Sequence, residues 1–346
     1  MSTLGEVIQT ARRARGLTQE ELATAIDVSQ AALSRYEKDL RVPEPDVLPR
    51  IADALGVTQR FMERARDPFA AIAVDAHMRR RATARATTWR HLEARLNMLR
   101  MHAEQLGEEI AIRARLIVPT FDPLATDPAE AARLTRMQWR MPIGPVRSLT
   151  RWLEAAGCVI VREDFGTSRV DGLSQWASDY PVIMLNVQSP TDRLRLTLAH
   201  ELGHLCLHGH DVPGDLEAQA NRFAAEFLMP EVIVRPQLRN LTLGKLADLK
   251  REWSVSMQAL IERAHDLRVI TSAKRTSLYK QLSARGWRTR EPFSDELTRE
   301  APELTQAVFD QLRSRGLSTT EIAQLAGFRD ADTNDLMMVQ RLKVVS

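Results

Sequence analysis

The sequence predicts a mainly helical protein with a small β-sheet, and three observations lead to this fold class. Apolar residues recur along much of the chain at the three- and four-residue spacing of amphipathic helices. Three short apolar runs between residues 158 and 187 have instead the length and composition of strands. A length of 346 residues suggests more than one domain. The predicted segments are 1–66, 67–115, 116–236 and 237–346.

The composition is that of an ordinary globular protein from a reducing compartment. Two cysteines, Cys158 and Cys206, are too few for a disulfide framework. The longest apolar runs are too short to span a bilayer, and the N-terminus lacks the apolar core of a secretory signal. The net charge of +3 is compatible with nucleic-acid binding but does not establish it. We expect a cytoplasmic protein without membrane contact.

The first segment predicts five short helices with tight breaks between them. Gly16 ends the first helix, and Thr18 with Glu21 forms a capping box for the second. Asp27–Ser29 is a three-residue turn, and Ser29 caps the third helix. Two short helices joined by such a turn have the geometry of a helix-turn-helix.

The stretch LTQEELATAIDVSQAALSRYE resembles the Cro/repressor-like (XRE) family, over about sixty residues of the chain. The resemblance implies a recognition helix at residues 30–38, base contacts near its start, and phosphate contacts from Gln19 and Arg35. The expected contacts with double-stranded DNA are Gln19, Ser29, Gln30, Ala31, Ser34 and Arg35. We expect a homodimer, because helix-turn-helix proteins usually bind DNA as dimers. The alternative is a dimerisation or partner-binding module.

Residues 67–115 predict a basic helical linker. Between residues 79 and 100 a single acid, Glu93, faces the arginines Arg79, Arg80, Arg81, Arg85, Arg90, Arg95 and Arg100. The run could form an arm that follows DNA phosphates. We favour a solvated helix face with Leu92, Leu96 and Leu99 packed inward, because charge runs usually lie in water.

The third segment mixes helix and strand. We expect a helix over Val146–Ala156, ended by Gly157. The predicted strands are CVIVRED, GLSQWASD and PVIMLNV, with Asp179 and Pro181 at the turn between the last two. A further helix begins near Pro190 or Thr191 and ends by Gly209.

This further helix contains the motif HExxH as His200, Glu201 and His204. Residues four apart lie on one helical face, so both imidazoles can reach one ion, with Glu201 beside them to act on a water molecule. The arrangement is typical of a zinc metallopeptidase, whose catalytic metal needs a third protein ligand.

Four residues are candidates for that third ligand. His208 lies about 6 Å further along a straight helix, which is too far for one ion. His210 has the spacing of the metzincin motif, but Leu207 stands where that motif needs glycine. Glu217 is the preferred candidate, because Asn221 follows it by four residues on a second predicted helix, as in glutamate-type zincins. Glu226 is the weaker alternative.

The paired stretches LAHELGHLCLHG and EAQANRFAAEFLMP resemble the ImmA/IrrE family of metallopeptidases, and the resemblance covers about Leu149 to Pro230. It implies a zincin-like α+β domain over 116–236, with His200, His204 and Glu217 as Zn²⁺ ligands. It also implies Glu201 as the general base and Asn221 as the residue that holds a ligand histidine.

The family resemblance implies a DNA-binding regulatory zinc endopeptidase of bacterial cytoplasm, associated with the nucleoid when bound to DNA. Members of the family cleave a cognate repressor, so the expected substrate is a repressor encoded nearby, and its cleavage would derepress stress-response or mobile-element genes. The alternative is a DNA-binding regulator or antitoxin-like component whose zincin domain is a sensing or structural module. Tyr180 and His208 are candidates for an additional oxyanion donor, although an ordinary surface or core role is preferred for His208.

The segment after residue 236 is again helical. The stretch LADLKREWSVSMQALIERA repeats the Leu-Ala, Val-Ser and Ala-Leu pattern of the N-terminal segment, and STTEIAQLAGF repeats it more faintly. Further helix-turn-helix units are one interpretation. A helical bundle with ordinary capping serines is the preferred one.

Overall fold

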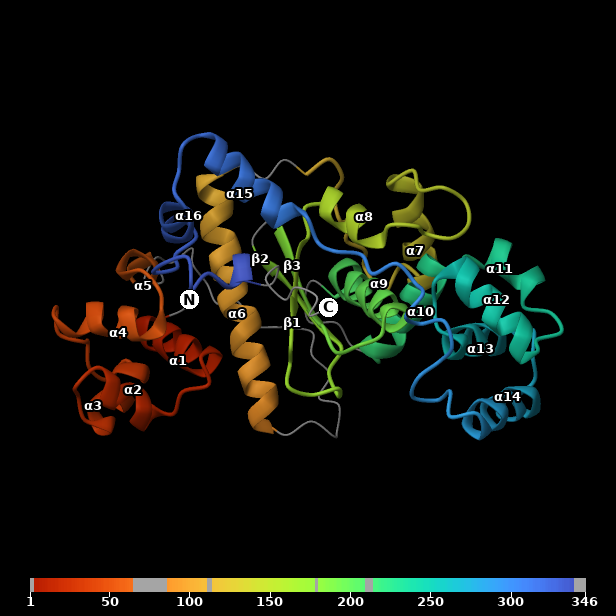
Figure 1. Ribbon diagram of the computed structural model, residues 1–346, viewed down its shortest axis with the longest axis horizontal. Helices are drawn as coiled ribbons and strands as arrows, with labels where there is room; N and C mark the ends of the chain where they lie inside the picture. The colour runs from red at the N-terminus through yellow and green to blue at the C-terminus, as the bar shows by residue number, and fades with distance from the viewer. Residues whose placement is uncertain (1–2, 65–85, 111–113, 178–179, 209–213, 339–346) are drawn as a thin grey trace.

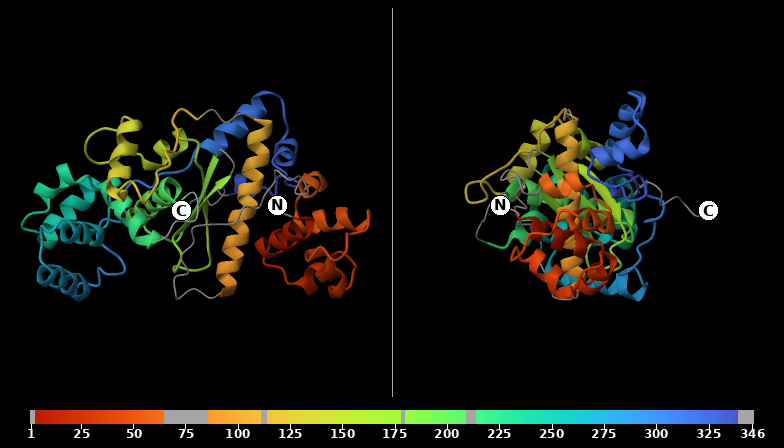
Figure 2. Two further views of the ribbon diagram at one scale, coloured as in Figure 1. Left: turned by 180° about the vertical axis from the view of Figure 1, so that it is seen from behind. Right: turned by 90° about the vertical axis from the view of Figure 1, so that its left-hand side faces the viewer.

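A computed structural model of the chain describes residues 3–64, 86–110, 114–177, 180–208 and 214–338 (Figure 1). The described chain is mostly helical with one three-stranded sheet, which confirms the predicted fold class. The molecule is elongated: the N-terminal helices form one end, the sheet lies near the middle, and helices α11–α14 form the other end (Figures 1 and 2).

The N-terminal unit has the five predicted helices around one apolar core. They are α1 (Leu4–Ala14), α2 (Gln19–Ala25), α3 (Gln30–Glu37), α4 (Val47–Leu55) and α5 (Gln59–Arg64). Thr18 and Glu21 form the predicted capping box at the start of α2. The Ser29 hydroxyl accepts a hydrogen bond from the backbone N–H of Ala32 and so caps α3.

The long helix α6 (Ala86–Glu109) stands between this unit and the sheet (Figure 2). One of its faces supplies Ala94 and Met98 to the N-terminal core. The opposite face buries three predicted positions against the sheet, and they are Leu92, Leu96 and Leu99. One helix therefore belongs to two apolar cores.

The arginine-rich run does not form a single solvated face. Arg95 is half-buried and pairs with Glu163 at 2.7 Å and Asp335 at 2.9 Å, and Arg100 is buried. Arg90 is exposed. The run from Arg79 to Arg85 lies outside the described residues, so the expectation of a basic arm there stays open.

The sheet has the strand order β1-β3-β2, with β3 (Tyr180–Asn186) at its centre. β1 (Val159–Glu163) runs parallel to β3, with Val159 opposite Val182. β2 (Gly172–Ala177) runs antiparallel to β3, with Trp176 opposite Pro181.

Two local predictions in this region were wrong. Pro181 is not in a turn but in β3, near the start of the strand, where a missing N–H is tolerated. Asp179 lies outside the described residues. The helix expected from Val146 is α8 (Leu149–Ala155), and the Val146 carbonyl instead accepts a hydrogen bond from Arg195.

Helices cover both faces of the sheet. α6 packs on one face, and α9 (Thr191–Leu207) packs on the other (Figure 1). α9 is in turn covered by α7 (Pro128–Gln138) and α10 (Leu216–Leu228). Successive side chains of β1 point to opposite faces of the sheet, so Ile160 packs in the core around α9 and Val161 in the core around α6.

The C-terminal helices pack in two places. Four of them continue the core around α9, and they are α11 (Glu231–Gln237), α12 (Leu243–Trp253), α13 (Met257–Asp266) and α14 (Ser272–Ala284). The remaining three return to α6 and the sheet, and they are α15 (Leu304–Ser314), α16 (Thr319–Leu325) and α17 (Asp335–Met338). Leu246 of α12 and Leu260 of α13, which belong to the repeated pattern, are buried in the core around α9.

Buried charges join this C-terminal half to the first turns of α9. The fully buried ammonium of Lys250 bonds to Asp192 of α9 and lies 2.8 Å from Glu291. Arg195, one turn further along α9, pairs with Glu300. Removing one partner of such a buried ion pair strongly destabilises the fold, because the other charge is left buried and uncompensated.

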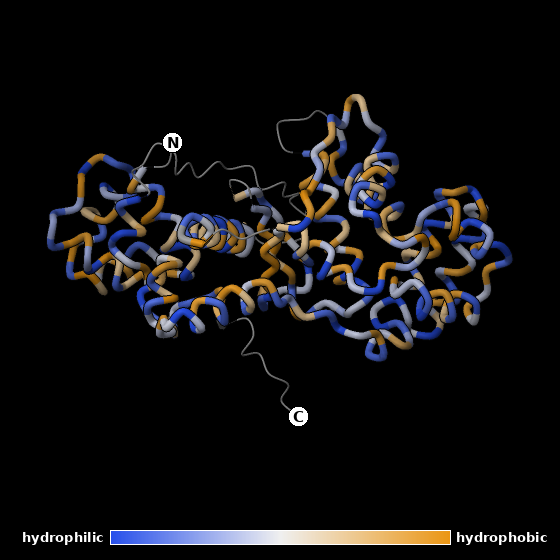
Figure 3. The backbone as a smooth tube through the Cα atoms, turned by 90° about the horizontal axis from the view of Figure 1, so that it is seen from above, coloured by the Kyte–Doolittle hydropathy of each residue, from blue (hydrophilic) through white to orange (hydrophobic). Residues whose placement is uncertain are grey.

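Polar and apolar residues alternate along the helices instead of forming long apolar stretches (Figure 3). Within the described ranges, no helix combines the length and the apolarity that crossing a membrane requires.

A buried histidine marks the junction of three parts of the chain. His102 of α6 is stacked between Phe61 of α5 and Phe328, with ring centroids 4.3 Å and 3.7 Å from its own. Its Nδ1–H donates to the carbonyl of Ala326 at 2.7 Å. Phe328 also forms an isolated β-bridge with Val57. Burial lowers the pKa of His102 from 6.5 to about 4.

We predict that acid weakens this junction. The folded pKa lies below the unfolded one, so the contribution of His102 is complete above pH 6.5 and is lost as the pH falls toward 4. Lowering the pH from 7 to 5 should reduce the free energy of unfolding by about 2 kcal/mol through this group. Denaturant unfolding of His102→Phe should show a correspondingly flatter pH profile. A wild-type slope in His102→Phe would contradict the assignment.

Candidate metal centre

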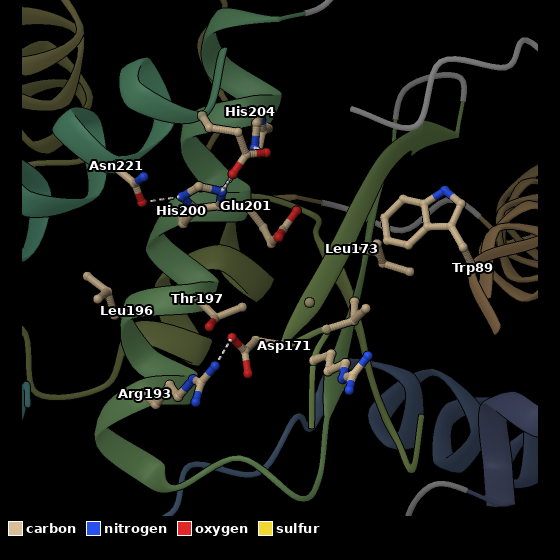
Figure 4. Close-up of a pocket in the computed structure, with 14 residues that line it drawn as sticks. Trp89, Asp171, Leu173, Arg193, Leu196, Thr197, His200, Glu201, His204 and Asn221 are labelled. Atoms are coloured by element: carbon tan, nitrogen blue, oxygen red, sulfur yellow. Dashed lines mark hydrogen bonds and ion pairs between the residues drawn. The ribbon is translucent and has the colours of Figure 1, made fainter. Parts of the chain in front are cut away.

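Two histidines on α9, labelled in Figure 4, converge with one glutamate on α10. The Nε2 atoms of His200 and His204 are 3.0 Å apart. The Glu217 carboxylate lies 3.7 Å from Nε2 of His200 and 3.6 Å from Nε2 of His204. Within the described ranges, these three are the His, Cys, Asp or Glu residues that form such a group.

The spacing of these atoms fits one ion. Two ligand atoms that are each about 2.0–2.1 Å from a tetrahedral zinc lie about 3.4 Å from each other. The three distances bracket this value, and the set of two imidazoles and one carboxylate is the donor set of a catalytic zinc. The three residues can therefore hold a metal and leave a fourth position for water.

A glycine allows the two helices to bring these side chains together. A Cβ atom at Gly203 would lie 3.2 Å from the Cα and the carbonyl oxygen of Ala220 and from the Cβ of Phe223. The backbones of α9 and α10 therefore come into close contact at Gly203, with no room for a side chain between them. Across the same contact, the Nδ1–H of His200 donates to Oδ1 of Asn221 at 3.0 Å, which points Nε2 toward the convergence point.

The alternative ligand candidates lie elsewhere. His208 is fully buried, and its Nδ1 contacts Nδ1 of His204, on the side of that ring opposite the convergence point. Glu226 is buried in an ion pair with Arg263. His210 lies outside the described residues.

Tyr180, a candidate oxyanion donor, does not line the cavity beside the three candidate ligands. Its ring instead packs against Gly107 of α6, where an added Cβ would come within 2.8 Å of the ring.

Glu201 is held inside the site by the sheet. The hydroxyl of Ser174 on β2 donates to Oε2 of Glu201 at 2.7 Å. Glu201 is 5% exposed, and burial raises the pKa of its carboxyl group, although His204 and Ser174 act in the opposite direction. A Cβ at Gly172 would lie 2.5 Å from Thr197, so this glycine lets β2 approach α9 closely.

The converging residues open onto a cavity of about 210 Å³. Its walls come from α9, α10, β2 and the loop before β2, and Trp89 of α6 closes one side near Leu173 (Figure 4). At one end of the cavity Arg193 pairs with Asp171 at 2.7 Å, close to the exposed Arg169. The cavity is therefore apolar on one side and charged at one end.

Sequence reasoning missed several of these residues. Ser174 follows Gly172 by two residues in β2, so the two lie on the same face of the strand. This period-two pattern could have placed Ser174 on the side facing α9. No local sequence pattern predicts the contact of His208 with Gln219 of α10 or the position of Trp89 at the wall of the cavity. Both depend on how separate helices cross.

The expected DNA-contacting residues lie at one end of the molecule, on α2 and α3 (Figure 1). Gln30, Ala31 and Arg35 are exposed, whereas Ser34 and Gln19 are half-buried. Within the described ranges, the exposed Arg35 makes no side-chain hydrogen bond or ion pair.

A chain of hydrogen bonds orients the start of α3. Glu37 is buried and accepts from Arg12 at 3.0 Å and from the Gln19 amide at 2.7 Å. The Gln30 amide then donates to Oε1 of Gln19 at 2.7 Å. Gln19 therefore links the buried ion pair to the side chain expected to face a base edge.

Comparisons with known proteins agree with this division. Residues 153–265 match the family model of peptidase M78, described as the IrrE N-terminal-like domain, and residues 8–58 match a helix-turn-helix model. The N-terminal part is also similar to endothelial differentiation-related factor 1 of Homo sapiens, with 39% identity over 57 residues. It is 32% identical over 60 residues to the HTH-type transcriptional regulator ImmR of Bacillus subtilis (strain 168).

The similarity to these two relatives is confined to the N-terminal helix-turn-helix part of the chain. The alignments span 16% and 17% of this chain, and 38% and 47% of the two relatives, so the chain spans less than half the length of each. The two family models instead cover separate parts of the chain. The predicted family resemblances are confirmed: the chain joins an XRE-type helix-turn-helix domain at residues 8–58 to an IrrE N-terminal-like domain of the metallopeptidase type at residues 153–265.

Proposed function

We propose that the protein is a DNA-binding regulatory zinc endopeptidase that cleaves a cognate repressor. The observation that carries this proposal is the convergence of three ligand atoms beside a buried glutamate, at the wall of an open cavity. His200, His204 and Glu217 would hold the zinc, and Asn221 would orient His200.

The chemistry follows from the placement of Glu201. Zinc in such a site lowers the pKa of a water molecule and polarises the peptide carbonyl. Glu201 precedes His204 by one helical turn and is fixed by Ser174. It is therefore positioned to accept the proton of the attacking water and to deliver it to the leaving amine.

The form of the cavity supports a peptide substrate. In the described part of the sheet, β2 is an edge strand, and Gly172 and Leu173 line the cavity. An edge strand presents backbone N–H and C=O groups to which an extended chain can add. Trp89 and Leu173 would contact an apolar side chain of the substrate, and Arg169 an acidic one.

A repressor is the proposed substrate because the same chain carries a domain that would bring the enzyme to DNA. The HTH-type transcriptional regulator to which the N-terminal part is similar is named as a regulator of transcription. We therefore place the protein in bacterial cytoplasm, bound to double-stranded DNA as a homodimer through residues 1–66. Residues 67–115 would be the linker, 116–236 the peptidase and 237–346 the C-terminal helical part.

A second candidate function is repression by DNA binding alone, with the metal domain as a sensing or structural module. The observation that favours it is the open DNA-binding face: Gln30, Ala31 and Arg35 stay exposed while the domain is packed on α6. The two candidates differ in whether the regulatory effect needs Glu201.

We predict about one zinc per chain in the purified full-length protein. His204→Ala and Glu217→Ala should each lose it, because two remaining ligands hold zinc poorly. Elemental analysis after dialysis against excess zinc and desalting is the measurement, and Glu231→Ala, a partly exposed carboxylate on α11 that pairs with Arg235, is the matched control. A wild-type protein that stays metal-free would contradict the proposal.

We predict that Glu201→Gln retains zinc but loses cleavage. Glutamine keeps an oxygen that can accept from Ser174, but it cannot take a proton, so the rate should fall by roughly 10²- to 10⁴-fold. The assay is incubation of the purified enzyme with repressors encoded beside its gene, followed by mass spectrometry of the products. Cleavage at the wild-type rate would exclude Glu201 as the base, whereas repression that survives this substitution while cleavage is absent in the wild type would favour the second candidate.

We predict salt-dependent DNA binding through α3. Gln30→Ala should weaken binding by about 1–3 kcal/mol and relax the preference at one base pair, whereas Arg35→Ala should weaken binding to all sequences and lower the salt slope by about one. Selection from a random DNA library gives the operator, and fluorescence anisotropy over a salt series gives the affinities. Arg315→Ala, exposed beyond α15, is the control. Equal affinities of all three variants and the wild type would contradict the assignment.

A further inference from the structure

The end of α9 turns one more histidine back toward the metal ligands. His208 follows the last helical residue and caps the helix with non-helical φ and ψ of −122° and 41°. Its backbone N–H still bonds to the carbonyl of His204 at 2.9 Å. The side chain is fully buried, so its ring is fixed by what surrounds it.

Both ring nitrogens of His208 have partners. Nε2 lies 2.8 Å from Oε1 of Gln219 on α10, and Nδ1 lies 2.9 Å from Nδ1 of His204. An amide oxygen only accepts hydrogen bonds, so the proton of a neutral His208 must be on Nε2. Its Nδ1 then carries a lone pair, which accepts a hydrogen bond from the Nδ1–H of His204.

This order of donors and acceptors has a consequence at the metal site. A neutral imidazole with its proton on Nδ1 presents a lone pair at Nε2. In His204, Nε2 is the atom that lies 3.0 Å from Nε2 of His200 and 3.6 Å from Glu217. The series Gln219–His208–His204 therefore selects the one neutral tautomer that can bind a metal at the convergence point.

The two ligand histidines are supported by different routes from the same helix. Asn221 accepts directly from His200, whereas Gln219 reaches His204 only through His208. The third ligand, Glu217, also lies on α10, so one short stretch of that helix would supply a ligand and the supports of both other ligands.

We propose that His208 and Gln219 are positioning residues that set the tautomer and the ring orientation of His204 for metal binding. The inference rests on the proposed metal site, and it assigns to His208 a role other than ordinary core packing. Support of this kind around a ligand typically changes metal affinity by about 10- to 100-fold.

The test uses the full-length protein and two probes, Zn²⁺ and Co²⁺ alone. Gln219→Leu removes the acceptor that orients His208, and His208→Leu removes the intermediate ring. Gln219→Glu keeps a side-chain oxygen in place and is the conservative rescue. His265→Leu, a partly exposed histidine of α13 that contacts Ser272, is the matched control.

We expect Gln219→Leu and His208→Leu to bind zinc roughly 10- to 100-fold more weakly in a competition with a chromophoric chelator. The visible absorption bands of the Co²⁺ protein should shift in both, because the ring of His204 is no longer held in one orientation. Gln219→Glu and His265→Leu should match the wild type in affinity and spectrum. Thermal unfolding of the metal-free proteins separates loss of support from loss of fold, and Gln219→Leu should melt within a few degrees of the wild type.

Two results would overturn the proposal in different ways. A wild-type protein that binds zinc, together with unchanged affinity and an unchanged Co²⁺ spectrum in Gln219→Leu, would refute the positioning role alone. A wild-type protein that binds neither ion would refute the metal site, and the positioning role with it.

Discussion

The close crossing of α9 and α10 is the contact on which the candidate site depends. Neither helix holds the complete set of candidate ligands, because the two histidines come from α9 and the carboxylate from α10. Their backbones approach where Gly203 faces Ala220, and any larger residue at position 203 would meet the Cα and carbonyl oxygen of the partner helix. Side-chain atoms can converge at a point only if the helices that carry them are fixed relative to each other within a fraction of an ångström.

The rest of the fold holds α9 in the position that this crossing needs. β2 contacts it from one side and orients Glu201 through Ser174. At its first turns, Lys250 and Glu300 compensate the buried charges of Asp192 and Arg195. A buried charge is stable only in the geometry that pairs it, so these contacts fix the rotation of α9 as well as its distance from the sheet. The segment after residue 236 therefore takes part in the geometry of the site without lining it.

Sequence patterns predicted the elements far better than the contacts between them. Periodicity and capping residues located the helices around Thr18 and Ser29, and the spacing of the motif placed His200 and His204 on one face. These signals are local, because they arise within one or two helical turns. Pro181 was misplaced because its position in β3 depends on pairing with Trp176 of another strand. The contact of His208 with Gln219 likewise depends on the end of α9 and on a second helix, so spacing alone could identify the residue but not its partner.

The helix α6 links the helix-turn-helix unit to the candidate metal site physically. Met98 packs in the core of the helix-turn-helix unit, Leu96 packs on the sheet, and Trp89 of the same helix lies at the wall of the cavity. The stacking of His102 between Phe61 and Phe328 joins the same helix to α5 and to the segment after α16. Packed interiors contain few voids into which side chains can move, so these contacts hold α6 firmly against both neighbours. One continuous helix therefore packs against the helix-turn-helix unit on one side and contributes to the wall of the cavity on the other.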